Sequence, residues 1–236
     1  MNYVAGFVTA VPAANKEAYR HSAVAAAGMF NDLGVTRMVE AWGDDVPDGK
    51  ITDFKGAVKA KPDEVIVFSW HEYPSKAVAE AANSRMMTDP RMAEIVATMP
   101  FDAQRMIYGG FELIVDTGAG KGDYVDGALV PVPVANKAAY SALAVEQAEI
   151  IMAHGALRVV EAWGDFVPRG KVTDYQGAVK AAADEQVVFS WVEWPSRAVR
   201  DAAWPKIFAD PRMQTPDQPY DGKRRVFGGF TPIFDA

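Results

Sequence analysis

Two glutamates, Glu40 and Glu161, occupy the same place in a segment that the chain contains twice. Each lies in the sequence Val-Glu-Ala-Trp-Gly-Asp, and the two are 121 positions apart (161 − 40). A carboxyl group among apolar side chains, or beside another carboxyl group, has a raised pKa and can exchange protons near neutral pH. Glu40 and Glu161 are therefore candidate catalytic residues, acting as acid or base.

Tryptophans and two further glutamates recur at the same shift and form a candidate ligand-binding set. Its members are Trp42, Trp70, Glu72, Trp163, Trp191 and Glu193. Indole rings can stack on a flat apolar molecule, and a few polar groups can orient it. The alternative is structural: the tryptophans are core residues, and the glutamates bind donors such as Lys59 and Lys180 or lie at a solvated sheet end.

The composition excludes several kinds of site. The chain has no cysteine, which rules out disulfides, thiolate nucleophiles and Cys-ligated zinc or iron–sulfur centres. Its three histidines align with non-histidine residues in the other copy: His21, His71 and His154. No symmetric metal or haem site is expected, although one haem on His71 or His154 alone stays open. We predict neither a metal nor a cofactor.

Charge and hydropathy limit the classes of molecule that the protein is expected to bind. The formal net charge is −7, the pI is near 5.0 and no long basic run is present, which opposes binding to nucleic acid or anionic lipid. No apolar run approaches the roughly 20 residues that span a bilayer. We therefore expect a soluble globular protein with no membrane segment and, by default, a cytoplasmic location.

The strands that carry the candidate residues decide which of them meet. Successive side chains of a strand point to opposite faces. Met38, Glu40 and Trp42 therefore share one face, and Phe68, Trp70 and Glu72 share another. We expect both sets, with their copies, to face a common cavity. Small residues such as Ser69 would pack under helices, and Arg37 and Arg158 would lie opposite the glutamates.

The order of elements predicts a βαββαβ module, written twice. The first copy shows strands over 3–11, 35–42, 65–73 and 106–115, helices from Asn15, Pro74-Ser75 and Asp89-Pro90, and a short added strand over 57–60. This is an α+β, ferredoxin-like pattern. The glycine-rich residues 118–121 serve as a linker between modules 1–117 and 122–236.

The two copies differ in their second helical region. Copy two contains Trp204-Pro205 and, further on, Pro216. Proline lacks the amide donor and clashes with the preceding turn, so this helix should be kinked or shortened. A site that depends on it would be open in one copy only.

Several motifs resemble the YbaA-like family of uncharacterised bacterial proteins. They are E-A-W-x-D-x-V-P-x-G-K-x-T-D, V-F-S-W-x-E-x-P-S, D-P-R-M and F/Y-G-G-F. The resemblance covers nearly the whole chain and implies the dimeric α/β-barrel fold, with two modules packed around a central cavity. Here both modules lie in one chain, as an intrachain pseudo-dimer. That fold group includes cofactor-free monooxygenases, isomerases and haem enzymes, so it leaves the chemistry open.

The sequence favours a module that binds a small, mostly apolar molecule in a cavity. One alternative is a cofactor-free enzyme, an isomerase or monooxygenase, that uses Glu40 or Glu161 as acid or base. The other is a scaffold whose interior is packed core. A filled interior would favour the scaffold, an empty apolar cavity would favour the binding module, and a buried carboxyl group with a raised pKa would favour the enzyme. Whether whole chains pair into a further homodimer stays open.

Overall fold

The computed structural model describes residues 2–213 and 218–236, which form two similar halves. The first half contains β1 (Tyr3–Pro12), α1 (Lys16–Asp32), β2 (Arg37–Asp45), α2 (Phe54–Ala57), β3 (Glu64–Tyr73), α3 (Lys76–Met86), α4 (Pro90–Ala97) and β4 (Ile107–Gly118). The second half contains β5 (Tyr124–Pro133), α5 (Lys137–Ala153), β6 (Arg158–Phe166), α6 (Tyr175–Ala178), β7 (Glu185–Trp194), α7 (Arg197–Ala209) and β8 (Val226–Asp235).

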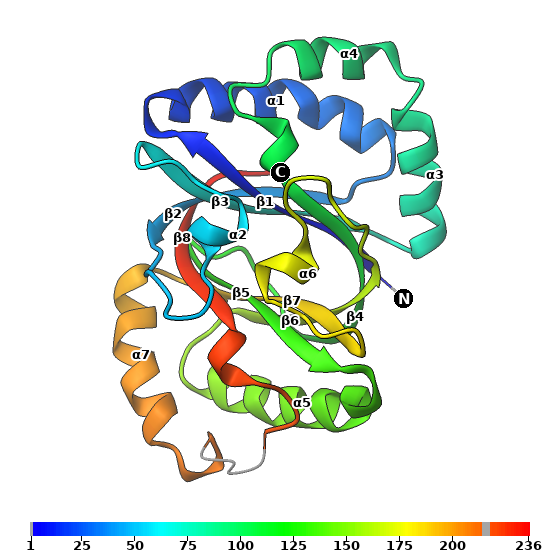
Figure 1. Cartoon of the computed structure of the whole chain (residues 1–236). Coiled ribbons are helices and arrows are strands. Elements are labelled where there is room, and N and C mark those ends of the chain that lie inside the picture. Colours follow the sequence, from blue (N-terminus) through cyan, green and yellow to red (C-terminus); the bar gives the residue numbers. More distant parts are fainter. Residues whose placement is uncertain (1, 214–217) are drawn as a thin grey trace.

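The eight strands form one closed antiparallel barrel in the order β1-β3-β2-β8-β5-β7-β6-β4. Each half contributes four adjacent strands, and the halves join edge to edge where β2 pairs with β8 and β4 pairs with β6. Figure 1 shows α1, α3 and α4 on one side of the barrel and α5 and α7 on the opposite side. The predicted α+β fold, two βαββαβ modules forming an intrachain barrel, is confirmed. The boundaries proposed for the two modules stay a prediction.

Local sequence signals explain where the helices begin. The Ser75 hydroxyl accepts a hydrogen bond from the amide of Val78 at the start of α3. The Asp89 carboxylate accepts a hydrogen bond from the amide of Arg91 at the start of α4, where Pro90 occupies the first helical position. Both patterns satisfy amide groups that have no partner inside the helix. Gly34 adopts a φ of 97° after α1, a conformation that glycine tolerates best.

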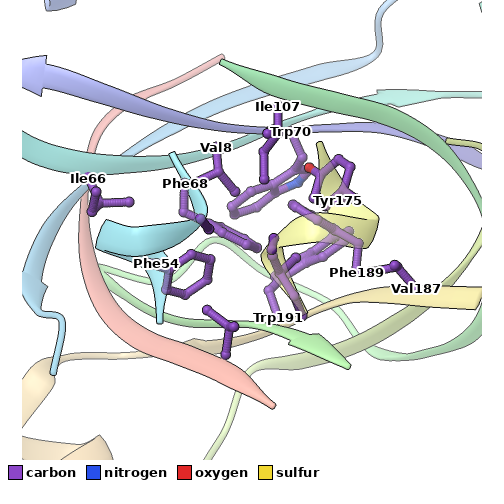
Figure 2. Close-up of a cluster of buried hydrophobic side chains, with 14 of the residues drawn as sticks. Val8, Phe54, Ile66, Phe68, Trp70, Ile107, Tyr175, Val187, Phe189 and Trp191 are labelled. Atoms are coloured by element: carbon purple, nitrogen blue, oxygen red, sulfur yellow. The ribbon is translucent and has the colours of Figure 1, made fainter. Parts of the chain in front are cut away.

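Aromatic side chains fill the interior of the barrel (Figure 2). The Phe68 and Phe189 rings stack with their centroids 4.4 Å apart, and the centroids of Trp70 and Trp191 are 4.7 Å apart. All four side chains are fully buried. The barrel interior is therefore packed core, and the expectation of a ligand cavity at the centre of the barrel is wrong.

The segment between β2 and β3 forms a helix where an added strand was expected. Asp53 caps α2 by accepting a hydrogen bond from the amide of Gly56, and Phe54 packs into the barrel core. Its counterpart α6 contributes Tyr175 in the same way. The prediction of a strand over 57–60 is wrong, because this segment turns back to cover the barrel interior.

The predicted difference between the second helical regions is found in part. After α3 the first half continues into the eight-residue α4, whereas in the described part of the second half a three-residue 3-10 turn, Pro211–Met213, follows α7. The preceding helix is not shortened, since α7 has 13 residues and includes Pro205. Pro216 lies outside the described residues.

Ion pairs connect the halves close to their pseudo-twofold axis. Arg37 of β2 donates to both carboxylate oxygens of Glu193 at 2.8 and 2.7 Å, and Arg158 of β6 donates to those of Glu72 at 2.7 and 3.1 Å. Glu193 has no exposed side-chain surface. Among the described residues, none of the helices is both long and apolar enough to cross a membrane.

Candidate functional site

A cavity of about 670 Å³ lies outside the barrel, between the sheet of the first half and the helices that cover it. Side chains from β1, β2 and β3 form its floor, and α1, α3 and α4 contribute its walls. In Figure 1 these helices lie above the barrel in the view shown. The volume falls within the range of roughly 300–1,000 Å³ typical of small-molecule sites.

Glu40 lies in this cavity and is 5% exposed. The Tyr19 hydroxyl, on α1, donates to Glu40 Oε2 at 2.6 Å, and Ser69 lies directly across from Glu40 on β3. Burial raises the pKa of Glu40 to about 7, although the hydrogen bonds from Tyr19 and Ser69 lower it. At neutral pH the carboxyl group can therefore both accept and donate a proton.

His71 is the second buried titratable group of the cavity. Its ring lies between Phe7 and Phe30, at centroid distances of 5.0 and 4.6 Å. Burial lowers the pKa of His71 to about 4, so the imidazole is neutral at pH 7. The side chain therefore adds aromatic surface to the cavity and no positive charge.

The second half completes the mouth of the cavity. Asp165 accepts a hydrogen bond from the Tyr3 hydroxyl at 3.0 Å and forms an ion pair with Lys76 at 2.7 Å. The neighbouring Phe166 also lines the cavity, and 52% of its surface is exposed. The site thus belongs to the closed barrel, because one half alone lacks these two residues.

The corresponding space in the second half is occupied by larger side chains. Asp126, Trp194, Arg200 and Trp204 replace Ala5, Tyr73, Ala79 and Asn83, each at a shift of 121 positions. Asp126 accepts hydrogen bonds from Trp194 at 2.9 Å, from Trp204 at 2.7 Å and from Arg200 at 2.8 Å. We refer to Asp126, Trp194, Arg200 and Trp204 as the filling cluster.

Glu161 is the counterpart of Glu40 in this filled half. It accepts hydrogen bonds from Tyr140 at 2.8 Å and Ser190 at 2.9 Å, which repeats the arrangement around Glu40. Burial raises the pKa of Glu161, whereas these hydrogen bonds and the positive charge of Arg225 lower it. In this part of the chain the two copies are offset by 119 positions, so Met106 stands at the position of Arg225 (225 − 106) and Glu40 has no such cation beside it.

The structure separates the residues that the sequence analysis grouped. The register pairs Val39 with Trp70 and Glu40 with Ser69, so Glu40 and Trp70 point to opposite faces of the sheet. Trp70 and Trp191 pack against each other inside the barrel with their ring planes tilted by 30°, which leaves no room for a ligand between them. The prediction that all candidate residues face one cavity is wrong.

The remaining candidates lie outside the cavity. Trp42 and Trp163 pack beneath α1 and α5, with the amino groups of Lys16 and Lys137 at 5.4 and 5.0 Å from their ring centroids. Glu72 and Glu193 pair with Arg158 and Arg37. The prediction that these arginines face away from the glutamates fails for Glu72 and Glu193, although it holds for Glu40 and Glu161.

Sequence reasoning missed three residues around Glu40: Tyr19, Ser69 and His71. A signal for two of them was present, because Tyr140 and Ser190 repeat Tyr19 and Ser69 at the shift that relates Glu161 to Glu40. Within residues 2–213 and 218–236, no group of three or more His, Cys, Asp or Glu side chains is arranged to hold a metal ion.

Comparisons with known proteins support this duplicated architecture. The family model described as "Protein of unknown function (DUF1428)" matches residues 2–103 and 123–222. The uncharacterised protein YbaA of Escherichia coli K12 is 61% identical over 116 residues, which are 49% of this chain and 99% of YbaA. YbaA of Shigella flexneri matches with the same identity and coverage.

Solved structures share the fold over the whole chain. A candidate monooxygenase from Fusobacterium nucleatum superimposes with a TM-score of 0.64 at 11% identity, covering 99% of this chain and 93% of that one. An anthrone oxidase-like protein has a TM-score of 0.54 at 13% identity, covering 100% and 92%. At these identities the similarity establishes the fold alone.

Proposed function

The chain belongs to the DUF1428 family, whose domain it contains twice, and we propose that it binds a small, mostly apolar molecule in the cavity of the first half. The observation that carries this proposal is the cavity of about 670 Å³ with Glu40 buried in it. The filling cluster supports it, because four larger side chains at equivalent sequence positions occupy the corresponding space in the second half.

The test fills the cavity with residues that the protein already uses. The variant Ala5→Asp/Ala79→Arg/Asn83→Trp introduces the counterparts of Asp126, Arg200 and Trp204. Binding of the neutral fluorescent probe N-phenyl-1-naphthylamine is measured by titration. We expect one probe per wild-type chain and at least about tenfold weaker binding to the variant, a loss of roughly 1.4 kcal/mol.

A matched control separates this effect from a loss of folding. Trp204→Asn gives the second half the residue that the first half has at Asn83. This variant should leave the affinity of the first-half cavity for the probe unchanged. Far-ultraviolet circular dichroism would establish that each variant is folded. Equal affinity of the wild type and the triple variant, or no binding by the wild type, would contradict the proposal.

A second candidate function is proton-transfer catalysis without a cofactor, and the position of Glu40 favours it. A carboxyl group with a pKa of about 7 in an apolar cavity can take a proton from one atom of a bound molecule and return it to another. This isomerase-type step needs no oxidant and consumes no second substrate. Tyr19 and Ser69 would hold the carboxyl group in place.

Deuterium exchange tests the second candidate directly. The protein is incubated in D₂O with 2-tetralone, an apolar ketone with acidic C–H groups, and exchange is followed by proton NMR. We expect wild type and Glu161→Gln to accelerate exchange and Glu40→Gln to lose the acceleration. Exchange that is equally fast with Glu40→Gln would exclude Glu40 as the base.

A further inference from the structure

The polar side chains at the floor of the cavity carry no positive charge. Tyr19 from α1 and Ser69 from β3 lie beside Glu40, and Thr9 from β1 and His71 from β3 line the same cavity. His71 is neutral, as described above, and the other three side chains are uncharged at pH 7. A ligand group that reaches the floor therefore meets a carboxyl group without a neighbouring cation.

The cationic side chain among the described lining residues lies at the mouth and is already paired. Lys76 forms an ion pair with Asp165 at 2.7 Å, and Glu80 also lines the mouth. In the second half, by contrast, the charge of Arg225 acts on Glu161. The first half has Met106 at that position, so a carboxylate or phosphate on the ligand would approach Glu40 unscreened and be repelled.

The side chains of the cavity walls favour a ligand with an aromatic ring system. Phenylalanine and tyrosine rings line the cavity, as do five methionines: Met38, Met86, Met92, Met99 and Met106. Thioether groups make favourable contacts with aromatic rings and adapt to ligands of different shape. Burying a large flat apolar ring against these side chains would supply most of the binding free energy.

From this arrangement we infer that the cavity selects a neutral aromatic hydroxyl compound, whose O–H group donates a hydrogen bond to the carboxylate of Glu40. The inference rests on the proposed binding function. A hydroxyl group has a single proton to donate, which the free acceptor capacity of Glu40 can satisfy. An ammonium group has three N–H donors and would lose its hydration in this apolar cavity, so it fits less well.

Four probes with the same naphthalene skeleton distinguish the ligand classes. Naphthalene, 2-naphthol, 2-naphthoate and 2-naphthylmethylamine are compared by displacement of N-phenyl-1-naphthylamine from the full chain at pH 6 and pH 8. We expect 2-naphthol to bind about tenfold more tightly than naphthalene at pH 8, because hydrogen bonds to charged groups are the stronger ones. This preference should weaken at pH 6, where Glu40 is mostly protonated.

Paired variants assign the preference to one carboxyl group. Glu40→Gln should reduce the affinity for 2-naphthol to that for naphthalene, whereas Glu161→Gln should retain the wild-type preference. If 2-naphthoate or the amine binds most tightly, or if 2-naphthol shows no preference, the inferred class is wrong while the binding function stands. If the fluorescent probe binds but none of the four displaces it, the inferred class fails while the binding function stands. If the probe itself does not bind, the proposed function fails as well.

Discussion

Glu40 and His71 respond to pH in opposite directions although they line the same cavity. Burial raises the pKa of Glu40 from 4.5 to about 7, so its contribution to stability is present below pH 4.5 and is lost as the pH rises to 7. Burial lowers the pKa of His71 from 6.5 to about 4, so its contribution is present above pH 6.5 and is lost as the pH falls to 4. The two dependences partly cancel in the wild type.

Glu40→Gln should remove one of these two opposite pH dependences of stability. The variant no longer carries the cost of ionising a buried carboxyl group, and a pKa shift from 4.5 to about 7 corresponds to about 3 kcal/mol. Relative to wild type, its free energy of unfolding should therefore rise by up to that amount between pH 4.5 and pH 8. Urea denaturation at a series of pH values measures this difference.

Two further variants test whether the pH-dependent change in stability comes from Glu40. Glu161→Gln should also raise the free energy of unfolding relative to wild type, but by less. The reason is that the charge of Arg225 already favours the ionised form of Glu161. His71→Val, which introduces the residue found at Val192, should gain stability relative to wild type as the pH falls from 6.5 to 4. A constant difference between Glu40→Gln and wild type across the pH range would contradict the assignment.

At the residue scale, the sequence identified Glu40 as a candidate and misplaced its surroundings. Strand alternation groups side chains within one strand, yet it does not relate the faces of two neighbouring strands. That relation depends on register, and here Glu40 pairs with Ser69 and not with Trp70. The helix predicted from Asn15 includes Tyr19, but the contact of Tyr19 with Glu40 depends on which face of the sheet that helix covers.

Among the elements, β1 and β5 each need a glycine where the barrel core is most crowded. A Cβ atom on Gly6 would lie 2.8 Å from the Phe189 ring, and one on Gly127 would lie 2.9 Å from the Phe68 ring. These rings stack on each other and cannot move away freely. The glycines therefore allow the strands to approach the aromatic core closely.

Gly6→Ala should destabilise the protein by about 1–3 kcal/mol, because an added methyl group overpacks this core. Chemical denaturation with tryptophan fluorescence measures the change. Gly28→Ala is the matched control: its added Cβ meets no atom within 4 Å and lies in the exposed surface of α1. This control should gain about 0.5–1 kcal/mol from helix propensity. Equal effects at the two glycines would argue against the packing explanation.

The order of the elements could be predicted because strand alternation, proline ends and helix caps act locally. The conformation of the segment after β2 could not be predicted. Its helix α2 has only four residues and contributes Phe54 to a core built mainly from distant strands. Lys59 and Lys180 both have a φ of 50°, which turns the chain after α2 and α6. Neither residue type predicts that conformation.

For the whole molecule, the ion pairs near the pseudo-twofold axis connect the two halves. Arg37→Ala would remove a bidentate partner from the fully buried Glu193 and should cost about 3 kcal/mol or more. Arg91→Ala provides the control, because that arginine side chain is 45% exposed and its solvent-screened ion pairs contribute little to stability. A similar small change in the thermal stability of both variants would show that Arg37 does not support the junction.

The duplication made the fold of the whole molecule predictable from sequence. The location of the cavity was not, because the halves join through strand edges and fill the barrel with Phe68, Phe189, Trp70 and Trp191. The asymmetry between halves was anticipated from prolines. Its main cause is instead the filling cluster, whose residues are dispersed over β5, β7 and α7.

Joining both halves in one peptide chain has a consequence for how the protein can change over time. In a barrel built from two identical subunits, each substitution appears twice, so a mutation that closes one site also closes the other. Here Asp126, Arg200 and Trp204 strengthen one half while Ala5, Ala79 and Asn83 keep the other open. Selection can therefore act on the packing of one copy and on the cavity of the other independently.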